Sequence, residues 1–221
     1  WSTTETESIP KTAHTYKSYD TKATTSKNGS VVTKCTVCGY VSKTTSIPYV
    51  KTVTLSTTSY TYDGKVKKPS VTVKDNKGNK IASSNYIVTY QSGRKNVGKY
   101  SVKITFKGNY SGTKTLYFTI NPKGTSISSV TAKSKGFTVK WKKQSTQTTG
   151  YQIQYSTSSK FTNAKTVTVS KNSTTSKTIS KLSAKKKYYI RVRTYKTVKV
   201  NGKSTKIYSS WSKAKYVTTK R

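Results

Sequence analysis

The sequence predicts an all-β chain made of tandem small β-sandwiches, with a short N-terminal β-hairpin segment in front of them. Threonine, valine and tyrosine, which favour strands, recur throughout. Short alternating runs are separated by turn residues at the spacing typical of sandwiches. No window shows a helical period. We therefore expect three parts: a hairpin segment at 1–48, one sandwich at 49–122 and a second at 123–221.

The N-terminal segment is polar and rich in threonine. Asn28-Gly29 lies between two strand-like runs, and this dipeptide is the strongest short signal for a hairpin turn. Because so few apolar residues are available for a core, we expect the segment to need a staple or a neighbouring module.

The middle segment contains short strand-like runs with turn signals between them. In the clearest run, alternation places on one face Tyr100, Val102, Ile104 and Phe106. Pro122 and Gly124 then interrupt any strand, so residues 121–125 are predicted to be a linker.

The C-terminal segment contains a second complete set of strand-like runs. They lie at 126–131, 137–142, 151–155, 166–169, 178–182, 188–195 and 209–217. This number of short runs indicates a second, separate sandwich.

The charge is strongly one-sided, with 43 Lys and Arg against 5 Asp and Glu. No carboxylate side chain follows Asp75, so ion pairs cannot hold the C-terminal half together. Such a charge keeps a chain soluble and monomeric and attracts polyanions. Lysine dominates and is dispersed, whereas base and phosphate reading favours the arginine fork, which argues against nucleic acid as the partner.

Trp141 ends a strand-like run in the C-terminal segment, and a further run covers 150–155. With these residues the segment resembles a fibronectin type III domain, in which Trp141 would be the core tryptophan and 150–155 the third strand. Leu182 followed by Tyr188 is similar to the family's tyrosine corner, in which the tyrosine hydroxyl bonds to nearby backbone. The run Ser210-Trp211-Ser212 matches the family's last strand.

Four short motifs lie within residues 49–120, at 60–65, 68–71, 96–100 and 108–112. With these motifs the segment resembles a bacterial immunoglobulin-like module of the kind repeated in Gram-positive surface proteins. The whole chain looks like the tail of a secreted protein from a gut Firmicute. This resemblance implies an extracellular, modular and non-enzymatic protein, and it names no ligand.

Catalytic chemistry has few candidates in this sequence, so we expect no enzyme. His14 is the single histidine, and acid–base catalysis needs titratable groups gathered in a pocket. Asp63 and Asp75 both precede glycine-containing turns, where aspartate bonds its own backbone.

Cys35-Thr36-Val37-Cys38-Gly39 is the only metal-like motif, and it forms half of a zinc ribbon. A structural zinc needs four ligands, of which His14 could supply a third and Asp20 or a water the fourth. The alternatives are a local disulfide, which is permitted outside the cell, or two unpaired thiols. No other cofactor is indicated.

Alternation along 188–195 places Tyr188, Ile190 and Val192 inward. The outward set, with the neighbouring residues of the third and last strands, is Tyr189, Arg191, Arg193, Tyr195, Gln152, Gln154 and Trp211. Guanidinium planes stack on indole faces, so this face is either a ladder that stiffens the sheet or an aromatic platform for a sugar or protein.

We therefore expect a non-catalytic binding or spacer region of a secreted or surface protein, a piece of a longer chain that carries no signal peptide and no membrane span. Its partner would be an anionic cell-envelope polymer, a glycan or a host protein. Two alternatives stay open: a specific host-protein ligand such as an immunoglobulin- or mucin-binding adhesin module, and an accessory region of a carbohydrate-active enzyme.

Overall fold

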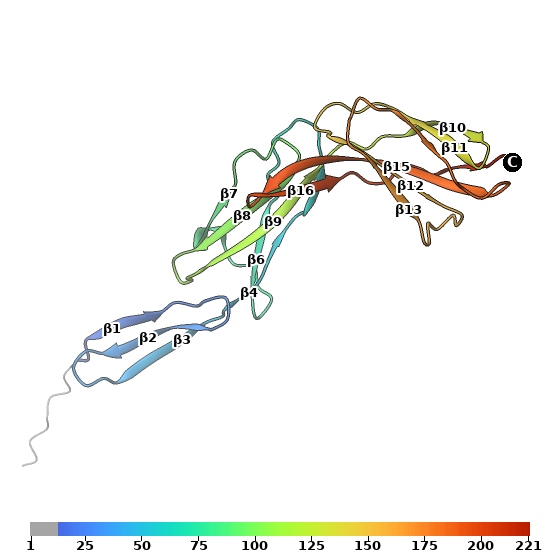
Figure 1. The fold of residues 1–221 in the computed structure, drawn as a ribbon. Helices are drawn as coiled ribbons and strands as arrows, with labels where there is room; N and C mark the ends of the chain where they lie inside the picture. The colour runs from blue at the N-terminus through green and yellow to red at the C-terminus, as the bar shows by residue number, and fades with distance from the viewer. Residues whose placement is uncertain (1–12) are drawn as a thin grey trace, which may run out of the picture. The chain divides into compact units, whose positions relative to one another are not determined.

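The computed structural model describes residues 13–221 and confirms the all-β fold class (Figure 1). The described part contains one short 3₁₀ turn, η1 (Ser83–Asn85). The chain divides into two compact units. The first holds residues up to Ser56, Val71–Thr89 and Lys103–Thr115, and the second holds Thr57–Ser70, Tyr90–Val102 and Leu116–Arg221. The start of the predicted segment 1–48 lies outside the described residues, and the three predicted domain bounds stay a prediction.

The first unit begins with a three-stranded antiparallel sheet rather than a two-stranded hairpin. It consists of β1 (Tyr16–Thr21), β2 (Gly29–Cys35) and β3 (Val41–Ile47), in that order. Every residue of β1 is exposed, and only Ile47 is buried in β3. The sheet therefore has little apolar core of its own.

Asn28-Gly29 is not the hairpin turn that the sequence predicts. Gly29 already belongs to β2, and the Asn28 side chain accepts the N–H of Tyr49 at 2.9 Å. Glycine is required here because an added Cβ would lie 2.2 Å from the carbonyl oxygen of Thr21. Close backbone approach, not turn conformation, explains this glycine.

The N-terminal sheet is joined within this unit to residues much later in the chain. Ala23 is fully buried, and its N–H donates to the carbonyl of Asn109 at 2.9 Å. The N–H of Ser111 donates back to the Ala23 carbonyl at 2.9 Å. This supplies the neighbour that so thin a sheet needs. The unit also contains a two-stranded sheet of β4 (Val50–Leu55) and β6 (Val71–Asp75).

A four-stranded sheet follows along the chain. Its order is β5 (Ser59–Thr61), β9 (Thr113–Asn121), β8 (Gly98–Phe106) and β7 (Tyr86–Tyr90). The short β5 runs parallel to β9. The predicted alternation in β8 is confirmed, since all four residues expected on one face are buried.

The second unit ends in a sandwich of two antiparallel sheets. One sheet contains β10 (Ile127–Lys133), β11 (Gly136–Trp141) and β14 (Ser176–Ile179). The other contains β13 (Lys165–Val169), β12 (Gly150–Ser156), β15 (Lys187–Val200), β16 (Lys203–Tyr208) and β17 (Lys215–Thr218). Both sheets contribute to one core, which includes Phe137, Val139, Trp141, Tyr151, Ile153, Ile190 and Val192.

The tyrosine corner is present, with the hydroxyl as acceptor. The N–H of Ser183 donates to Tyr188 Oη at 3.3 Å, and Leu182 packs on the core cluster. The corner therefore anchors the start of β15 to the preceding loop.

Strand β16 is an element that the seven predicted runs omit. It pairs with the second half of β15 through a two-residue loop, Asn201-Gly202. Both loop residues have positive φ, 50° and 77°, which is the geometry of a type I′ hairpin turn. The sequence thus contains a true Asn-Gly hairpin, although at a different place from the predicted one.

The predicted last strand is also shorter than expected. Only β17 is a strand within 209–217, and it pairs with the first half of β15. Residues 209–214 are bonded to β15 irregularly: Ser209 Oγ accepts from the N–H of Thr194, and Ser212 Oγ accepts from the N–H of Val192, both at 3.0 Å. Two hydroxyls therefore replace carbonyls of a regular ladder.

The predicted linker at 121–125 is not a free segment. Asn121 ends β9, and Pro122 is buried. The carbonyl of Lys123 accepts the hydroxyl of Thr194 at 2.7 Å. This bond ties the segment to β15 within the second unit. None of the described residues forms a helix long and apolar enough to cross a membrane.

Candidate functional site

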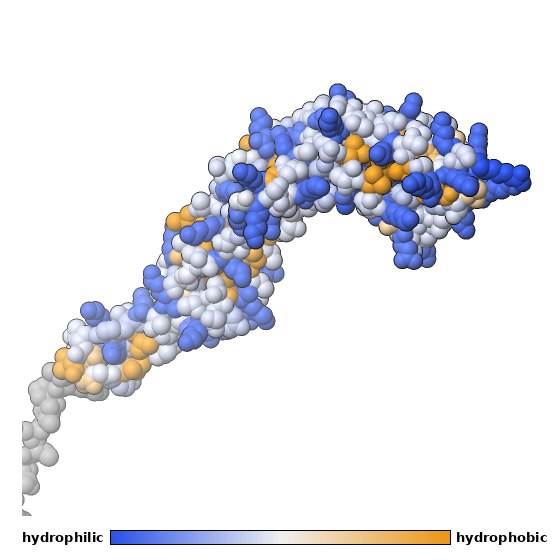
Figure 2. Space-filling model, in the orientation of Figure 1, coloured by the Kyte–Doolittle hydropathy of each residue, from blue (hydrophilic) through white to orange (hydrophobic). Residues whose placement is uncertain are grey.

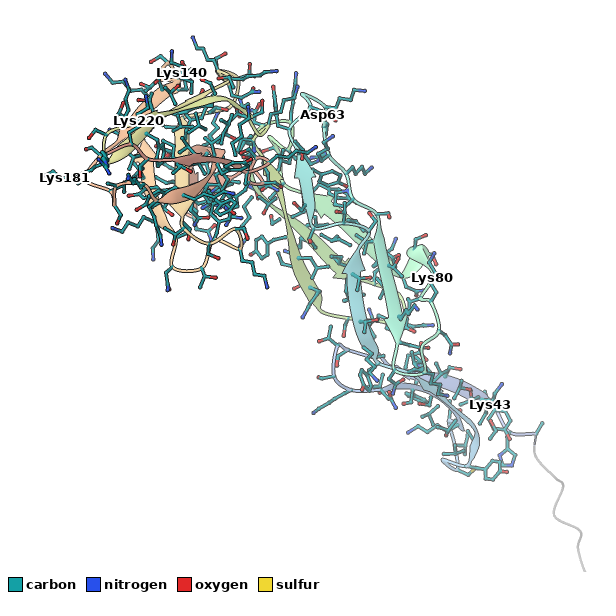
Figure 3. The ribbon with its side chains drawn as sticks, turned by 90° about the vertical axis from the view of Figure 1, so that its right-hand side faces the viewer. Lys43, Asp63, Lys80, Lys140, Lys181 and Lys220 are labelled. Atoms are coloured by element: carbon teal, nitrogen blue, oxygen red, sulfur yellow. The ribbon has the colours of Figure 1, made fainter. Side chains whose placement is uncertain are left out.

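Exposed lysines are spread over the C-terminal sandwich. From Lys123 onward every lysine is exposed except the half-buried Lys196. Figure 3 shows Lys140, Lys181 and Lys220 projecting outward, and in Figure 2 hydrophilic residues are scattered over the visible face rather than gathered in one block. Among the described residues one salt bridge is present, between Lys67 and Asp63. The cationic surface is therefore almost entirely unpaired.

Two arginines of β15 form a stacked column with aromatic rings. The Arg191 guanidinium carbon lies 4.0 Å from the ring centre of Phe161 and 4.8 Å from that of Trp211. The Arg193 carbon lies 4.2 Å from Trp211 and 3.9 Å from Tyr208. These five side chains make up what we call the Arg–aromatic column, and in it each guanidinium has an aromatic ring on both sides.

The edges of both guanidiniums are also engaged, by glutamines of β12. Arg193 donates from Nε at 3.0 Å and from Nη2 at 2.7 Å to Gln152 Oε1. Arg191 Nε donates to Gln154 Oε1 at 2.7 Å. Strand register causes this, because Gln152 lies opposite Arg193 and Gln154 opposite Arg191.

The glutamine amides extend the network to the next strand. Gln152 Nε2 and Gln154 Nε2 donate at 3.3 Å to hydroxyls of Thr168 and Thr166 in β13. Burial lowers the pKa of both guanidiniums from its ordinary value. A desolvated charge needs hydrogen bonds, and the glutamines supply them.

The structure brings together Arg191, Arg193, Trp211, Gln152 and Gln154, as the parity of β15 predicts. Tyr189 lies beside them on the strand, but its ring pairs with Tyr216 of β17, with centres 6.1 Å apart. The two tyrosines share Lys187, whose Nζ lies 5.2 Å and 4.0 Å from their ring centres.

Tyr195 is the exception, because it is only 2% exposed and offers no ring to solvent. It lies opposite Gly150 on one side and Tyr208 on the other. Since Gly150 has no side chain, the phenol can lie across its Cα, and Lys206 covers the ring with Nζ 4.9 Å from its centre. The prediction that Tyr195 belongs to an exposed face was wrong.

Two members of the column were missed by sequence reasoning. Tyr208 ends β16, and the Asn-Gly hairpin would have placed it next to Tyr195. Phe161 lies in the loop between β12 and β13 with a positive φ of 60°. Such a loop conformation leaves no periodic signal in the sequence.

A hollow of about 340 Å³ lies at one end of the same sandwich. Its lining combines Tyr155, Leu182, Tyr188 and Lys165 with hydroxyl and amide groups of Ser156, Thr157, Ser158, Thr162 and Asn163. The hydroxyl and amide groups offer hydrogen-bond donors and acceptors to a ligand, and the lysine adds a positive charge.

Both candidate catalytic carboxylates accept hydrogen bonds within turns. Asp63 accepts from Lys67 and from the N–H of Lys65, and these bonds hold its pKa below the usual value. Desolvation alone would raise the pKa of Asp75, but hydrogen bonds from Asn79 and Lys77 outweigh it and lower the pKa. The turn interpretation of both residues is confirmed by these bonds.

A separate cluster in the first unit contains His14, Cys35 and Cys38. Their donor atoms all lie within 4.8 Å of one another, and Cys38 Sγ is 3.4 Å from His14 Nδ1. Both cysteines are free, Cys35 buried and Cys38 exposed. Hydrogen bonds from the backbone N–H groups of Cys38 and Val37, and then from His14, lower the pKa of Cys35 to about 6.

Asp20 does not join this cluster. Tyr16 lies opposite Cys35 in the sheet, whereas Asp20 lies opposite Val31. Four residues along a strand separate two positions by about 13 Å. The suggestion that Asp20 supplies a fourth metal ligand was therefore wrong.

The fold defines the class of protein, a chain of tandem β-sandwich modules. More particularly, residues 121–213 match the fibronectin type III domain, a module that typically serves in binding or spacing and not in catalysis. This confirms the resemblance of the C-terminal segment, while the immunoglobulin-like module and the Firmicute source stay predictions.

The solved structures that match this chain include two from multidomain proteins. The crystal structure of chicken CNTN1 FN1-FN3 domains is 18% identical with a TM-score of 0.40, covering 88% of this chain and 78% of that one. Domains A168-A170 from titin are 14% identical with a TM-score of 0.31, covering 88% and 75%. No curated protein sequence matches the chain.

Proposed function

We propose that this chain is an extracellular binding and spacer region of a bacterial surface or secreted protein, and that its lysine surface contacts an anionic polymer of a cell envelope or mucin type. One observation carries the proposal. No carboxylate side chain follows Asp75, while nearly every lysine of the C-terminal sandwich is exposed. A basic surface without internal counterions is a general attractant for polyanions.

The distribution of the charge favours a polymer over a small anion. The exposed lysines are dispersed over several strands and loops instead of converging on one hollow. Each is a hydrated point charge, and a flexible polyanion can satisfy many of them at once. Such contacts are screened over about 10 Å at 0.1 M salt, so the affinity would depend steeply on ionic strength.

The two arginines of the Arg–aromatic column are not free to bind a partner, which supports the assignment of binding to the lysines. Its guanidiniums are stacked on both sides and bonded along the edge to Gln152 and Gln154. A partner would have to displace these contacts before using either arginine. We therefore assign the column a scaffold role and place binding on the lysines.

A second candidate is a specific host-protein ligand. Tyr216 is 64% exposed beside Tyr189, with Lys187 over both rings. Tyrosine anchors protein interfaces because it buries a large surface at little entropic cost. This tyrosine pair would bind its partner with little dependence on salt.

The test measures binding of the 221-residue chain to poly(glycerol phosphate), to a sulfated glycan and to neutral dextran at low and physiological salt. We expect both polyanions to bind, with affinity falling steeply as salt rises, and dextran not to bind. In a triple variant, Lys140, Lys181 and Lys220 are replaced by Gln, which should weaken binding and flatten the salt dependence.

The matched control replaces the exposed hydroxyls of Ser128, Ser134 and Ser180 by Ala, which leaves the charge unchanged and should leave binding unchanged. Salt-independent binding, or equal affinity of the lysine variant and the control, would contradict the proposal. Binding to dextran alone would instead point to the hollow beside Tyr155 and Tyr188.

A further inference from the structure

We infer that His14, Cys35 and Cys38 bind one zinc ion, which serves as a staple of the N-terminal sheet. The lysine surface makes no use of this cluster, so the inference is independent of the proposed function. Two thiolates and an imidazole are ligands that zinc prefers, and the structure brings them together from two separate segments.

The distances fit a tetrahedral ion. With ordinary zinc–sulfur and zinc–nitrogen bond lengths, a sulfur and a nitrogen ligand lie about 3.5 Å apart and two sulfurs about 3.8 Å apart. Cys38 Sγ and His14 Nδ1 are 3.4 Å apart, and all three donors fall within 4.8 Å. A zinc ion therefore needs only a slight adjustment of side chains.

The Cys-x-x-Cys turn brings the two cysteines back toward each other. The turn closes through Gly39, whose N–H donates to the Cys35 carbonyl at 3.1 Å and whose φ is +74°. This turn therefore places both sulfurs within reach of one ion.

The histidine is held in place by its neighbours. Its ring stacks on Tyr40, with centres 5.7 Å apart, and lies 5.8 Å from Tyr16. The adjoining backbone is tied to the turn, because the N–H of Thr36 donates to the Thr15 carbonyl at 2.9 Å. Both segments that carry ligands are thus fixed relative to each other.

Charge and access are also compatible with zinc. Two thiolates neutralise the divalent ion, which matters in a chain with a formal net charge of +38. The three ligands line a hollow of about 310 Å³ together with Ala13, Thr15 and Val37. The hollow leaves room for a water molecule. Because the described residues offer no further donor to the cluster, we assign the fourth ligand to that water.

The N-terminal sheet is one that a bound zinc ion would stabilise. Strand β1 is exposed throughout, and β3 buries only Ile47. A sheet with so little apolar burial is marginal on its own, and a bound metal contributes its binding free energy to folding. The cluster lies at the end of the sheet distant from Ala23.

The experiment titrates zinc into the reduced, metal-free 221-residue chain against a chromophoric chelator, with cobalt as a spectroscopic substitute. We expect one equivalent to bind, and the cobalt form to show the visible bands and thiolate charge transfer of a tetrahedral site. Cys38→Ser and His14→Gln should each weaken binding by more than about 100-fold, beyond the usual loss from an outer-sphere partner. Asp20→Asn, the matched control, should bind as the unaltered chain does.

Hydrogen exchange separates a lost ligand from a lost fold. We expect zinc to slow exchange in residues 14–47 of the unaltered chain and of Asp20→Asn, but not of Cys38→Ser, and to leave the C-terminal sandwich unchanged in all three. Failure of the reduced chain to bind zinc would overturn the inference. Equal binding by Cys38→Ser and Asp20→Asn would also overturn it, as would a Cys35–Cys38 disulfide that gives the same exchange protection without metal.

Discussion

The phenol of Tyr195 lies across the bare Cα of Gly150, its partner on the neighbouring strand. A Cβ at position 150 would be 3.0 Å from Tyr195 Oη and 2.1 Å from the carbonyl oxygen of Val169. The glycine thus lets the ring be buried and lets β13 pair closely with β12.

Replacing Gly150 by Ala should destabilise the C-terminal sandwich. The clash with the Val169 carbonyl involves backbone and cannot be relieved by a rotamer change, so we expect a loss of about 1–3 kcal/mol. Urea denaturation followed by tryptophan fluorescence measures it. Gly124→Ala, where the new Cβ would make only ordinary contacts, is the control and should be nearly neutral. Equal stability of the two variants would show that the strands can separate without cost.

Trp211→Ala should cost about 1–2 kcal/mol, because it removes the ring between two guanidiniums together with its partial burial. Trp211→Phe should recover part of this loss. Unfolding of both variants is followed by circular dichroism, since the substitution removes a fluorophore. A loss below a few tenths of a kcal/mol for Trp211→Ala would mean that the stacking stabilises nothing.

Tyr189→Ala tests whether the neighbouring face binds a partner. If the second candidate function holds, this variant should lose affinity for the host protein while its stability barely changes, because Tyr189 is only half-buried. Pull-down from host secretions and thermal unfolding supply the two measurements. Unchanged capture would remove the tyrosine pair from consideration.

Gln152→Leu should destabilise the sandwich by about 1–3 kcal/mol. The amide is buried and accepts two bonds from Arg193, so its loss leaves desolvated donors without a partner. Gln154→Leu should cost less, because Gln154 is more exposed and accepts a single bond from Arg191. A double-mutant cycle with Arg193→Met isolates the coupling, which should exceed about 0.5 kcal/mol. Additive losses would contradict the hydrogen-bonded pair.

Asn201→Ala should weaken the β15–β16 hairpin by about 1 kcal/mol, because alanine tolerates the left-handed conformation at this position poorly. Asn201→Gly should be nearly neutral, since glycine adopts positive φ freely. Hydrogen exchange of Lys203–Tyr208 reports on the hairpin directly. Faster exchange in the glycine variant than in the alanine variant would contradict the type I′ turn.

Much of the Arg–aromatic column could be predicted from the sequence because strand parity is a local property. Alternation along β15 correctly separated Ile190 and Val192 from Arg191 and Arg193. Alternation does not predict the burial of Tyr195, because that burial depends on Gly150 across the sheet and not on the strand itself. Alternation also does not predict the position of Phe161, which is set by a loop conformation.

The cluster of His14, Cys35 and Cys38 also shows what the sequence indicates and what only the structure decides. The sequence identified the cysteine pair and its only histidine, because residue types and short spacings are visible in one dimension. The sequence also suggested Asp20 as a fourth ligand, because nothing in the sequence gives the register between β1 and β2. Only that register places His14 beside the turn and Asp20 far along the strand.

The sequence by itself determined the all-β class, the strand faces of the C-terminal sandwich, its tyrosine corner and the unpaired positive charge. These depend on residue type and on a period of two, which a single strand already expresses. The tertiary structure alone decided which side chains meet across strands: Arg193 with Gln152, Tyr195 with Gly150, and His14 with Cys38. The physical reason is that such contacts require backbone pairing between residues far apart in the chain, and its register emerges only when the whole core packs.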